Sequence, residues 1–234
     1  MPQNWPRKSE DSSSERKDTM PLDIELLVFD LDGTLVDSKQ DLANAVNHTL
    51  EKMGSGKIDD TFIFGLIGEG LRELLAKSFN THDNSLLDEA IPTFRAYYRE
   101  HLLDNTRLYD GVRETIEALG KKKALITNKP EGFSRTILER LGILPFFDLV
   151  LGVDSVENRK PHPEPLLKAL DYFHTSREKC LVIGDSNLDI EMGKAGGTLT
   201  CGVTYGFRGR EELEESGADY IIDTIGELKE LVLP

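Results

Sequence analysis

The sequence predicts a doubly wound α/β fold, in which a parallel, Rossmann-like sheet carries a small helical cap domain inserted after its first strand. A short, uninterrupted apolar run, Leu26–Phe29, suits a central strand that helices cover on both faces. Helical patterns without a convincing strand follow from Ser38 to Arg107. From Tyr109 onward, helices and strands alternate, and this regular alternation is typical of a parallel sheet built from crossover units.

The inserted segment contains three predicted helices. The first covers 41–53, where apolar residues recur near helical spacing and Gly54 provides the stop. Two more are predicted at 71–79 and 86–103, and Pro92 in the last one marks a first turn or a kink. This last helix also carries an aromatic group, which we interpret mainly as packing residues: Phe94, Tyr97 and Tyr98.

The alternating part of the chain completes the predicted sheet. After the first strand we expect strands at 124–127, 149–151, 180–183, 200–203 and 220–222. Helices are expected at 112–119, 133–141, 165–172 and 188–195, and at the C-terminus. The basic run 121–123 is interpreted as a solvated edge. The predicted division is a disordered tail at 1–23, an α/β core made of 24–38 and 108–234, and a helical cap at 39–107.

Composition and charge exclude several classes of protein. The 234 residues include 28 Lys and Arg against 42 Asp and Glu, for a net charge of −14. This balance argues against nucleic-acid binding, which depends on clustered Lys and Arg. The sequence has no bilayer-length apolar stretch and no signal-peptide pattern near its start, and its two cysteines lie outside any zinc-site spacing. We therefore expect a cytoplasmic monomer or homodimer with no membrane or nucleic-acid partner.

Polar side chains follow the predicted strands where each of them ends. In chain order they are Asp30 and Asp32, Thr127 and Asn128, Lys160, and Asp185 with Asp189. Because ligands bind at the carboxyl ends of strands in open parallel sheets, we expect these side chains to meet in one crevice.

The chemistry of this set is coherent. Several carboxylates in one crevice repel each other unless a cation lies among them, and oxygen ligands suit Mg²⁺. A carboxylate beside the metal can attack phosphorus, and a second one two residues on can donate a proton to the leaving group and later activate water. Thr127, Lys160 and backbone N–H groups can hold phosphoryl oxygens. We therefore predict a small phosphorylated metabolite as the substrate.

Four motifs in order carry a resemblance to a known family. They are Asp-Leu-Asp-Gly-Thr-Leu-Val-Asp-Ser at 30–38, Thr-Asn-Lys-Pro at 127–130, Lys160-Pro161, and Gly-Asp-Ser-Asn-Leu-Asp at 184–189. From residue 24 to the C-terminus the chain resembles the haloacid-dehalogenase-like phosphohydrolases. The resemblance implies that Asp30 is a nucleophile that forms an aspartyl-phosphate, and that Asp32 is the acid/base.

The same resemblance implies the binding residues. Phosphate would be bound by Gly33, Thr127, Asn128 and Lys160, and Lys160 would also restrain Asp30. Mg²⁺ would be held by the side chains of Asp30 and Asp185 and by the backbone carbonyl of Asp32, with Asp189 as an auxiliary ligand. From the residues alone, Asp189 is equally well explained as a charge in the first turn of its helix.

The closer resemblance is to the phosphoglycolate phosphatase branch, which makes 2-phosphoglycolate the expected substrate. The stretches Ile-Thr-Asn-Lys-Pro and Lys-Pro-His-Pro-Glu-Pro-Leu carry it, and the helical insert matches the cap of that branch in place and size. The cap motif Ile67-Gly68-Glu69-Gly70 departs from the branch, where Asn is usual between the glycines. Glu69 would lie awkwardly beside a substrate carboxylate unless Arg72 or a water offsets its charge.

Other functions remain open. A sugar phosphomutase or a pyrophosphatase of the same fold would differ mainly in its cap residues. A dehalogenase would need neither Asp32 nor Asp185, and a phosphonate hydrolase would need a cap lysine in a context that Lys52, Lys57 and Lys77 do not provide. A non-catalytic binding scaffold would be expected to have lost its catalytic or metal-binding carboxylates, and this chain keeps them.

Overall fold

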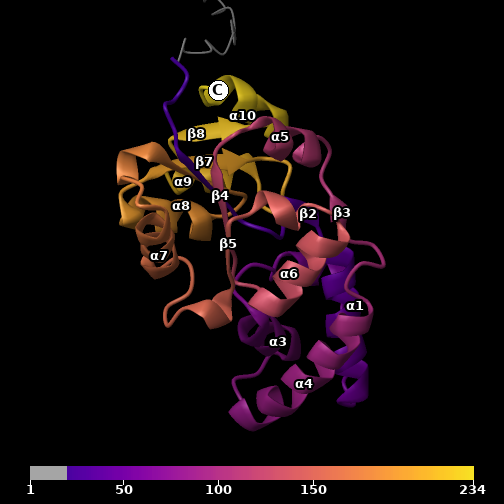
Figure 1. Cartoon of the computed structure of the whole chain (residues 1–234). Coiled ribbons are helices and arrows are strands. Elements are labelled where there is room, and N and C mark those ends of the chain that lie inside the picture. Colours follow the sequence, from indigo (N-terminus) through magenta and orange to yellow (C-terminus); the bar gives the residue numbers. More distant parts are fainter. Residues whose placement is uncertain (1–19) are drawn as a thin grey trace, which may run out of the picture.

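A six-stranded parallel sheet forms the core of the computed structural model, which describes residues 20–234 (Figure 1). Its strands are β1 (Leu26–Phe29), β4 (Lys122–Ile126), β5 (Leu149–Leu151), β6 (Cys180–Gly184), β7 (Leu199–Val203) and β8 (Tyr220–Ile222). They lie side by side in the order β5-β4-β1-β6-β7-β8. The chain therefore adds β4 and β5 on one side of β1, and then crosses over to add β6, β7 and β8 on the other side. This reversal beside β1 is where α/β sheets place their ligands.

The first strand is central, as the apolar run predicts. All four residues of β1 are buried, and Phe29 lies opposite Leu125 of β4 and Ile183 of β6. Alternate side chains point to two separate apolar clusters, so both faces of the sheet are covered. The helices of this part of the chain are α5 (Val112–Ala118), α6 (Glu131–Arg140), α7 (Glu164–Phe173), α8 (Asn187–Gly196), α9 (Arg210–Glu215) and α10 (Leu228–Leu231). Single 3₁₀ turns occur at Leu144–Phe146, Val153–Ser155, Arg177–Lys179 and Ile225–Glu227. The prediction of a doubly wound α/β fold is confirmed.

Between β1 and β4 the chain forms a helical cap that lies beyond one end of the sheet (Figure 1). Its helices are α1 (Lys39–Lys52), α2 (Asp60–Phe64), α3 (Leu71–Phe79) and α4 (Asn84–Glu100). The short helix α2 is absent from the predictions because five residues are too few to show a helical period. Pro92 lies inside α4 and not in its first turn.

Two short strands join the cap to the core. They are β2 (Val36–Asp37) and β3 (Arg107–Leu108), which pair in antiparallel fashion. The Asp41 carboxylate accepts backbone N–H bonds from Asn105 and Thr106, the latter at 2.8 Å. These contacts tie the start of α1 to the end of the insert, so the cap has a defined base on the core.

The interpretation of the basic run at 121–123 is wrong for Lys123. Strand β4 begins at Lys122, so Lys123 lies within the sheet and is buried. Its ammonium is satisfied by backbone carbonyls, including that of Lys121 at 3.0 Å.

Of the tail predicted at 1–23, residues 1–19 lie outside the described residues. The N–H of Leu22 donates to the Leu231 carbonyl of the C-terminal segment at 2.7 Å. Among residues 20–234, no helix has the length and apolar character needed to cross a bilayer.

Candidate active site

Asp30 and Asp32 lie in the loop that leaves β1. The Asp30 N–H still donates to Ile183 O at 3.0 Å, so Asp30 is fixed to the end of the sheet. The chain then turns back at Gly33, whose φ is +87°. A Cβ on Gly33 would lie 2.2 Å from an Asp185 oxygen, so glycine is what allows this turn to approach Asp185. The Gly33 N–H donates to Val36 O at 2.9 Å and is thus engaged within the turn.

Asp185 and Asp189 come from the end of β6 and the first turn of α8. Ser186 caps that helix, with its hydroxyl donating to Asp189 Oδ2 at 2.7 Å. Asp185 Oδ2 accepts a 2.7 Å bond from the backbone N–H of Phe207, and Thr34 Oγ1 lies 3.5 Å from Asp185 Oδ1. The position of Asp189 is therefore compatible with both interpretations, a residue of the helix's first turn and a residue of the crevice. One of its carboxylate oxygens completes the helix cap, and the other faces the crevice.

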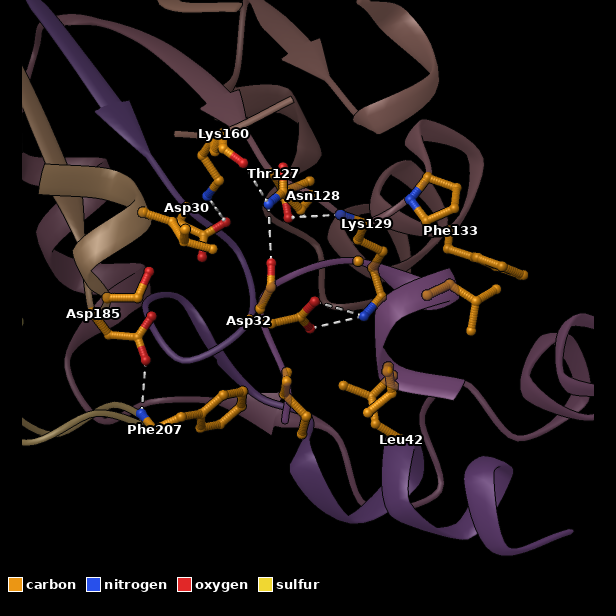
Figure 2. A pocket seen from close by; sticks show the side chains of 18 of the residues that line it. Asp30, Asp32, Leu42, Thr127, Asn128, Lys129, Phe133, Lys160, Asp185 and Phe207 are labelled. Carbon is orange, nitrogen blue, oxygen red and sulfur yellow. Dashed lines mark hydrogen bonds and ion pairs between the residues drawn. The ribbon is translucent and has the colours of Figure 1, made fainter. Parts of the chain in front are cut away.

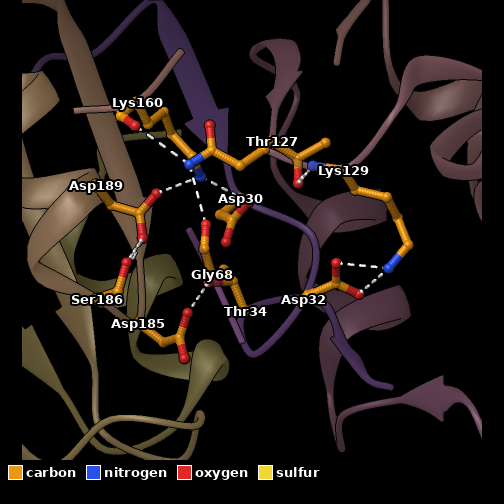
Figure 3. Close-up of polar contacts among 11 residues, drawn as sticks. Asp30, Asp32, Thr34, Gly68, Thr127, Lys129, Lys160, Asp185, Ser186 and Asp189 are labelled. Carbon is orange, nitrogen blue, oxygen red and sulfur yellow. Dashed lines mark hydrogen bonds and ion pairs between the residues drawn. The ribbon is translucent and has the colours of Figure 1, made fainter. Parts of the chain in front are cut away.

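Lys160 connects the loop after β1 with the first turn of α8 by contacting one carboxylate of each (Figure 3). Its Nζ lies 2.7 Å from Asp30 Oδ1 and 2.7 Å from Asp189 Oδ1, and its side chain is buried. Burial alone lowers the pKa of Lys160, but the charges of Asp189 and Asp30 outweigh this effect and hold the pKa above its ordinary value. Lys160 is therefore a buried, charged lysine that restrains Asp30.

Three buried carboxylates, those of Asp30, Asp185 and Asp189, offer oxygens within 4.8 Å of one another. Burial raises the pKa of Asp185 well above its ordinary value, and the charges of Asp30 and Asp189 raise it further. Burial also raises the pKa of Asp30 to about 6, although Lys160 opposes the shift. One lysine among three acids leaves negative charge in excess, and a hard cation with oxygen ligands fits this set.

This cluster makes the stability of the metal-free protein depend on pH. Between the ordinary pKa of Asp30, 3.8, and its folded value of about 6, the folded protein binds a proton that the unfolded chain has released. Stability therefore falls as the pH rises through this window, by on the order of 2–3 kcal/mol for this group. Asp30→Asn removes the loss. In urea unfolding with EDTA, we expect the variant to gain stability over wild type between about pH 4 and about pH 6. A difference in unfolding free energy between variant and wild type that stays constant over this pH range would contradict the raised pKa of Asp30.

Thr127 and Asn128 follow β4, as predicted, and both are buried in the same crevice. Thr127 lines the crevice and its hydroxyl accepts a 3.2 Å bond from the Lys129 N–H. The Asn128 amide donates instead to Gly68 O of the cap at 3.0 Å and to Lys160 O at 3.2 Å. The Asn128 side chain thus connects the cap, the Lys160 loop and the end of β4.

Lys129 is the residue that sequence reasoning missed. Its Nζ donates to both oxygens of Asp32, at 2.9 and 2.7 Å, and Ser38 Oγ donates to the same carboxylate. The Lys129 side chain is only 5% exposed. Its place directly after Thr127 and Asn128 at a strand end was the available signal. Its partner lies 97 positions away, which no local spacing reveals.

A cavity of about 70 Å³ lies between the carboxylates and the cap (Figure 2). The cap lines it with apolar groups: Leu42, Ile67, Leu71, Leu74, Phe94 and the ring of Tyr98. Of the aromatic group in α4, Phe94 and Tyr98 line this cavity, whereas Tyr97 stacks against His48 and His101.

The loop at 65–70 closes the cavity against the core. Arg208 donates to Gly65 O and to Ile67 O, both at 2.9 Å. The charge of Glu69 is met by Lys77 at 2.7 Å, not by Arg72, which pairs with Asp88 across the cap. The expectation about Arg72 is therefore corrected. Glu69 is absent from the residues that line the cavity, whereas Gly68 and Gly70 on either side of it are among them.

Comparison with known proteins agrees with this geometry. The family model described as "Haloacid dehalogenase-like hydrolase" matches residues 27–203. A phosphoglycolate phosphatase of Colwellia psychrerythraea is 38% identical over 214 residues, covering 87% of this chain and 95% of that protein. A pyrophosphatase, PpaX, of Halalkalibacterium halodurans is 32% identical, covering 90% of this chain and 98% of that protein.

Solved structures give the same result for the fold. A crystal structure of a predicted phosphoglycolate phosphatase from Haemophilus somnus has a TM-score of 0.83 and 31% identity, covering 89% of this chain and 98% of that one. The similarity to this structure thus extends over nearly the whole chain and includes both the parallel sheet and the inserted helical cap. The motifs, the arrangement of the carboxylates and the matched length lead to one conclusion: the chain belongs to the haloacid dehalogenase-like hydrolase family.

Proposed function

We propose that the protein is a Mg²⁺-dependent phosphatase that hydrolyses 2-phosphoglycolate through an aspartyl-phosphate on Asp30. The observation that carries the proposal is the position of Asp30, which is fixed at the end of the central strand, held by Lys160 and close to Asp185. The relatives named phosphoglycolate phosphatase support the substrate. The predicted cytoplasmic location and the monomeric or homodimeric state stay predictions.

The metal site would use three ligands from this chain. The side chains of Asp30 and Asp185 and the backbone carbonyl of Asp32 would hold Mg²⁺, while Asp189 would act mainly through Lys160, which it binds at 2.7 Å. When bound, Mg²⁺ neutralises charge on the phosphoryl oxygens and on the carboxylates around them. The buried carboxylates with raised pKa values fit such an ion because they lack enough cationic partners of their own.

The chain's own residues would carry the reaction in two steps. Asp30 attacks phosphorus, the bond from phosphorus to the ester oxygen breaks, and Asp32 donates a proton to that leaving oxygen. Asp32 then accepts a proton from water as the water oxygen attacks the phosphorus of the aspartyl-phosphate, which releases phosphate and regenerates Asp30. Thr127 Oγ1 and Lys160 Nζ would bind the phosphoryl oxygens, and Lys160 also orients the attacking carboxylate.

We assign the exclusion of water to the cap, taken as residues 39–107, with the core as 24–38 and 108–234. Asn128 and Arg208 of the core donate to cap backbone carbonyls in this structure, so the cap is held against the core. Closure of this kind protects an aspartyl-phosphate while the leaving group departs, and opening admits substrate and releases product.

The lining of the cavity disfavours a sugar. A sugar phosphate would place several hydroxyls against the apolar side chains of the cap, where they would lose their hydrogen bonds to water. This argues against a sugar phosphomutase. The second candidate is a pyrophosphatase, which the PpaX relative supports.

The test is phosphate release from 2-phosphoglycolate, pyrophosphate and β-glucose 1-phosphate, each with Mg²⁺ and with EDTA. We expect turnover of 2-phosphoglycolate that EDTA abolishes and Mg²⁺ restores, at a kcat/KM at least about 100-fold above that of the other two, because a mismatched polar group in such a pocket costs on the order of 3 kcal/mol. Preference for pyrophosphate would replace the proposal by the second candidate. Activity that survives EDTA would contradict the metal site.

A further inference from the structure

Lys129 lies in the cavity, on the side of Asp32 away from Asp30 (Figures 2 and 3). Two of its three N–H groups are used by the Asp32 oxygens. Its Nζ also lies 5.0 Å from the centroid of the Tyr98 ring, which belongs to the cap. A buried ammonium thus stands where the core meets the cap, next to the acid/base of the proposed reaction.

Tyr98 of the cap faces the same part of the cavity as Lys129. It is 1% exposed and lines the cavity, and its hydroxyl makes no hydrogen bond of normal geometry among residues 20–234. The Lys129 ammonium is close enough to lower the pKa of Tyr98, although burial, the larger effect, raises it. The Tyr98 ring is held by Phe133 of α6, with the ring centroids 5.3 Å apart. An unpaired buried hydroxyl is costly, because it has lost its bonds to water. A ligand oxygen in the cavity would supply the missing partner.

The other two cations that line the cavity are already engaged. Lys160 is held between Asp30 and Asp189, and Arg208 donates to two backbone carbonyls of the cap. Leu42 and Phe133 are apolar members of the lining on this side of the cavity, while the Asn128 amide, also in the lining, is used by Gly68 O and Lys160 O (Figure 2). Lys129 and Tyr98 are therefore the polar groups available to the organic end of a substrate.

The neighbourhood of Asp32 is where the organic end of 2-phosphoglycolate would lie. Asp32 must reach the ester oxygen to give it a proton, and one methylene separates that oxygen from the substrate carboxylate. Lys129, 2.7–2.9 Å from the Asp32 oxygens, would then lie near that carboxylate. An ammonium or a hydroxyl that donates to a carboxylate forms a charge-assisted hydrogen bond, which is about twice as strong as a bond between neutral groups.

We propose that Lys129 of the core and Tyr98 of the cap together bind the carboxylate of the substrate and so select a phosphorylated carboxylic acid. The assignment rests on the proposed phosphatase activity. Because one donor comes from each domain, a substrate carboxylate also bridges them, whereas an uncharged ester of the same size leaves the Tyr98 hydroxyl unpaired and offers Lys129 no second anion.

The test compares 2-phosphoglycolate with ethyl phosphate, in which a methyl group replaces the carboxylate. We expect Lys129→Met to lower the ratio of their kcat/KM values by about 10- to 100-fold and Tyr98→Phe to lower it by about 5-fold, while Lys129→Arg restores part of the ratio. The control is Lys77→Gln, a cap lysine that pairs with Glu69 outside the cavity and should leave the ratio unchanged.

A second measurement separates carboxylate binding from an effect on Asp32. In an Asp30→Asn background with Mg²⁺, Lys129→Met should weaken calorimetric binding of 2-phosphoglycolate by at least about 10-fold and leave binding of ethyl phosphate within about 2-fold. Equal losses for both esters, in turnover and in binding, would overturn the selective role and leave the phosphatase proposal standing. Wild-type protein that hydrolyses both esters equally well would overturn the substrate and this assignment together.

Discussion

Asp30→Asn is expected to lower Mg²⁺-dependent phosphate release by on the order of 10⁴-fold or more, the scale seen when a covalent nucleophile is removed. An amide lacks the anionic oxygen that attacks phosphorus, and no other carboxylate can take its place. Asp32 is held by Lys129 through both oxygens, and Asp185 is fixed by the backbone N–H of Phe207. Steady-state release from 2-phosphoglycolate, measured at saturating Mg²⁺, checks the expectation.

The variant must also remain folded for the result to count. Asp30 is a buried carboxylate whose pKa is raised by burial, so the amide relieves a charge and keeps nearly the same shape. We expect unchanged circular dichroism and, in EDTA at neutral pH, a melting temperature no lower than that of wild type. Asp171→Asn, an exposed carboxylate on α7, is the matched control and should keep full activity. A folded Asp30→Asn protein with substantial turnover would reject Asp30 as the nucleophile.

The sheet and the acidic crevice could be predicted because their signals are local. An apolar run followed by Asp30 and Asp32 identifies both a strand and the ligand-binding end of that strand. The order of alternating helices and strands predicts the parallel sheet, and the carboxyl ends of its strands bring together Asp30, Lys160 and Asp185, which are far apart in sequence. These features needed no knowledge of side-chain contacts.

What the sequence left undetermined depends on contacts between distant segments. The pairing of Lys129 with Asp32 and the approach of Lys129 to the Tyr98 ring are visible only once core and cap are assembled. The apolar residues of α3 recur at helical spacing in the sequence, and only packing decides that Leu71 and Leu74 line the cavity while Leu75 packs in the apolar core. Lys123 was misread because a strand beginning with lysines lacks the usual apolar start.

Lys160→Met is expected to cost about 3–5 kcal/mol of unfolding free energy in EDTA at neutral pH, which is typical when one partner of a buried ion pair is removed. The lysine is 3% exposed and lies 2.7 Å from both Asp30 and Asp189, so the methionine leaves two buried carboxylates without their cation. Activity should fall as well, because Lys160 orients Asp30. Lys123→Met is the matched control, since Lys123 is a buried lysine whose ammonium contacts backbone carbonyls.

The stability lost in Lys160→Met is expected to depend on pH. The pKa of Lys160 lies above its ordinary value, since the charges of Asp189 and Asp30 outweigh the opposing effect of burial, so its stabilising contribution is present throughout the neutral range and is lost only in strong alkali. The carboxylates that it leaves behind can take up protons in acid. The deficit of Lys160→Met against wild type should therefore be smaller at pH 5 than at pH 8, and urea unfolding at both values measures it. A deficit below about 1 kcal/mol at both would mean that the ion pairs only balance their own desolvation. In that case Lys160 would serve catalysis alone, by holding Asp30 in position for its attack.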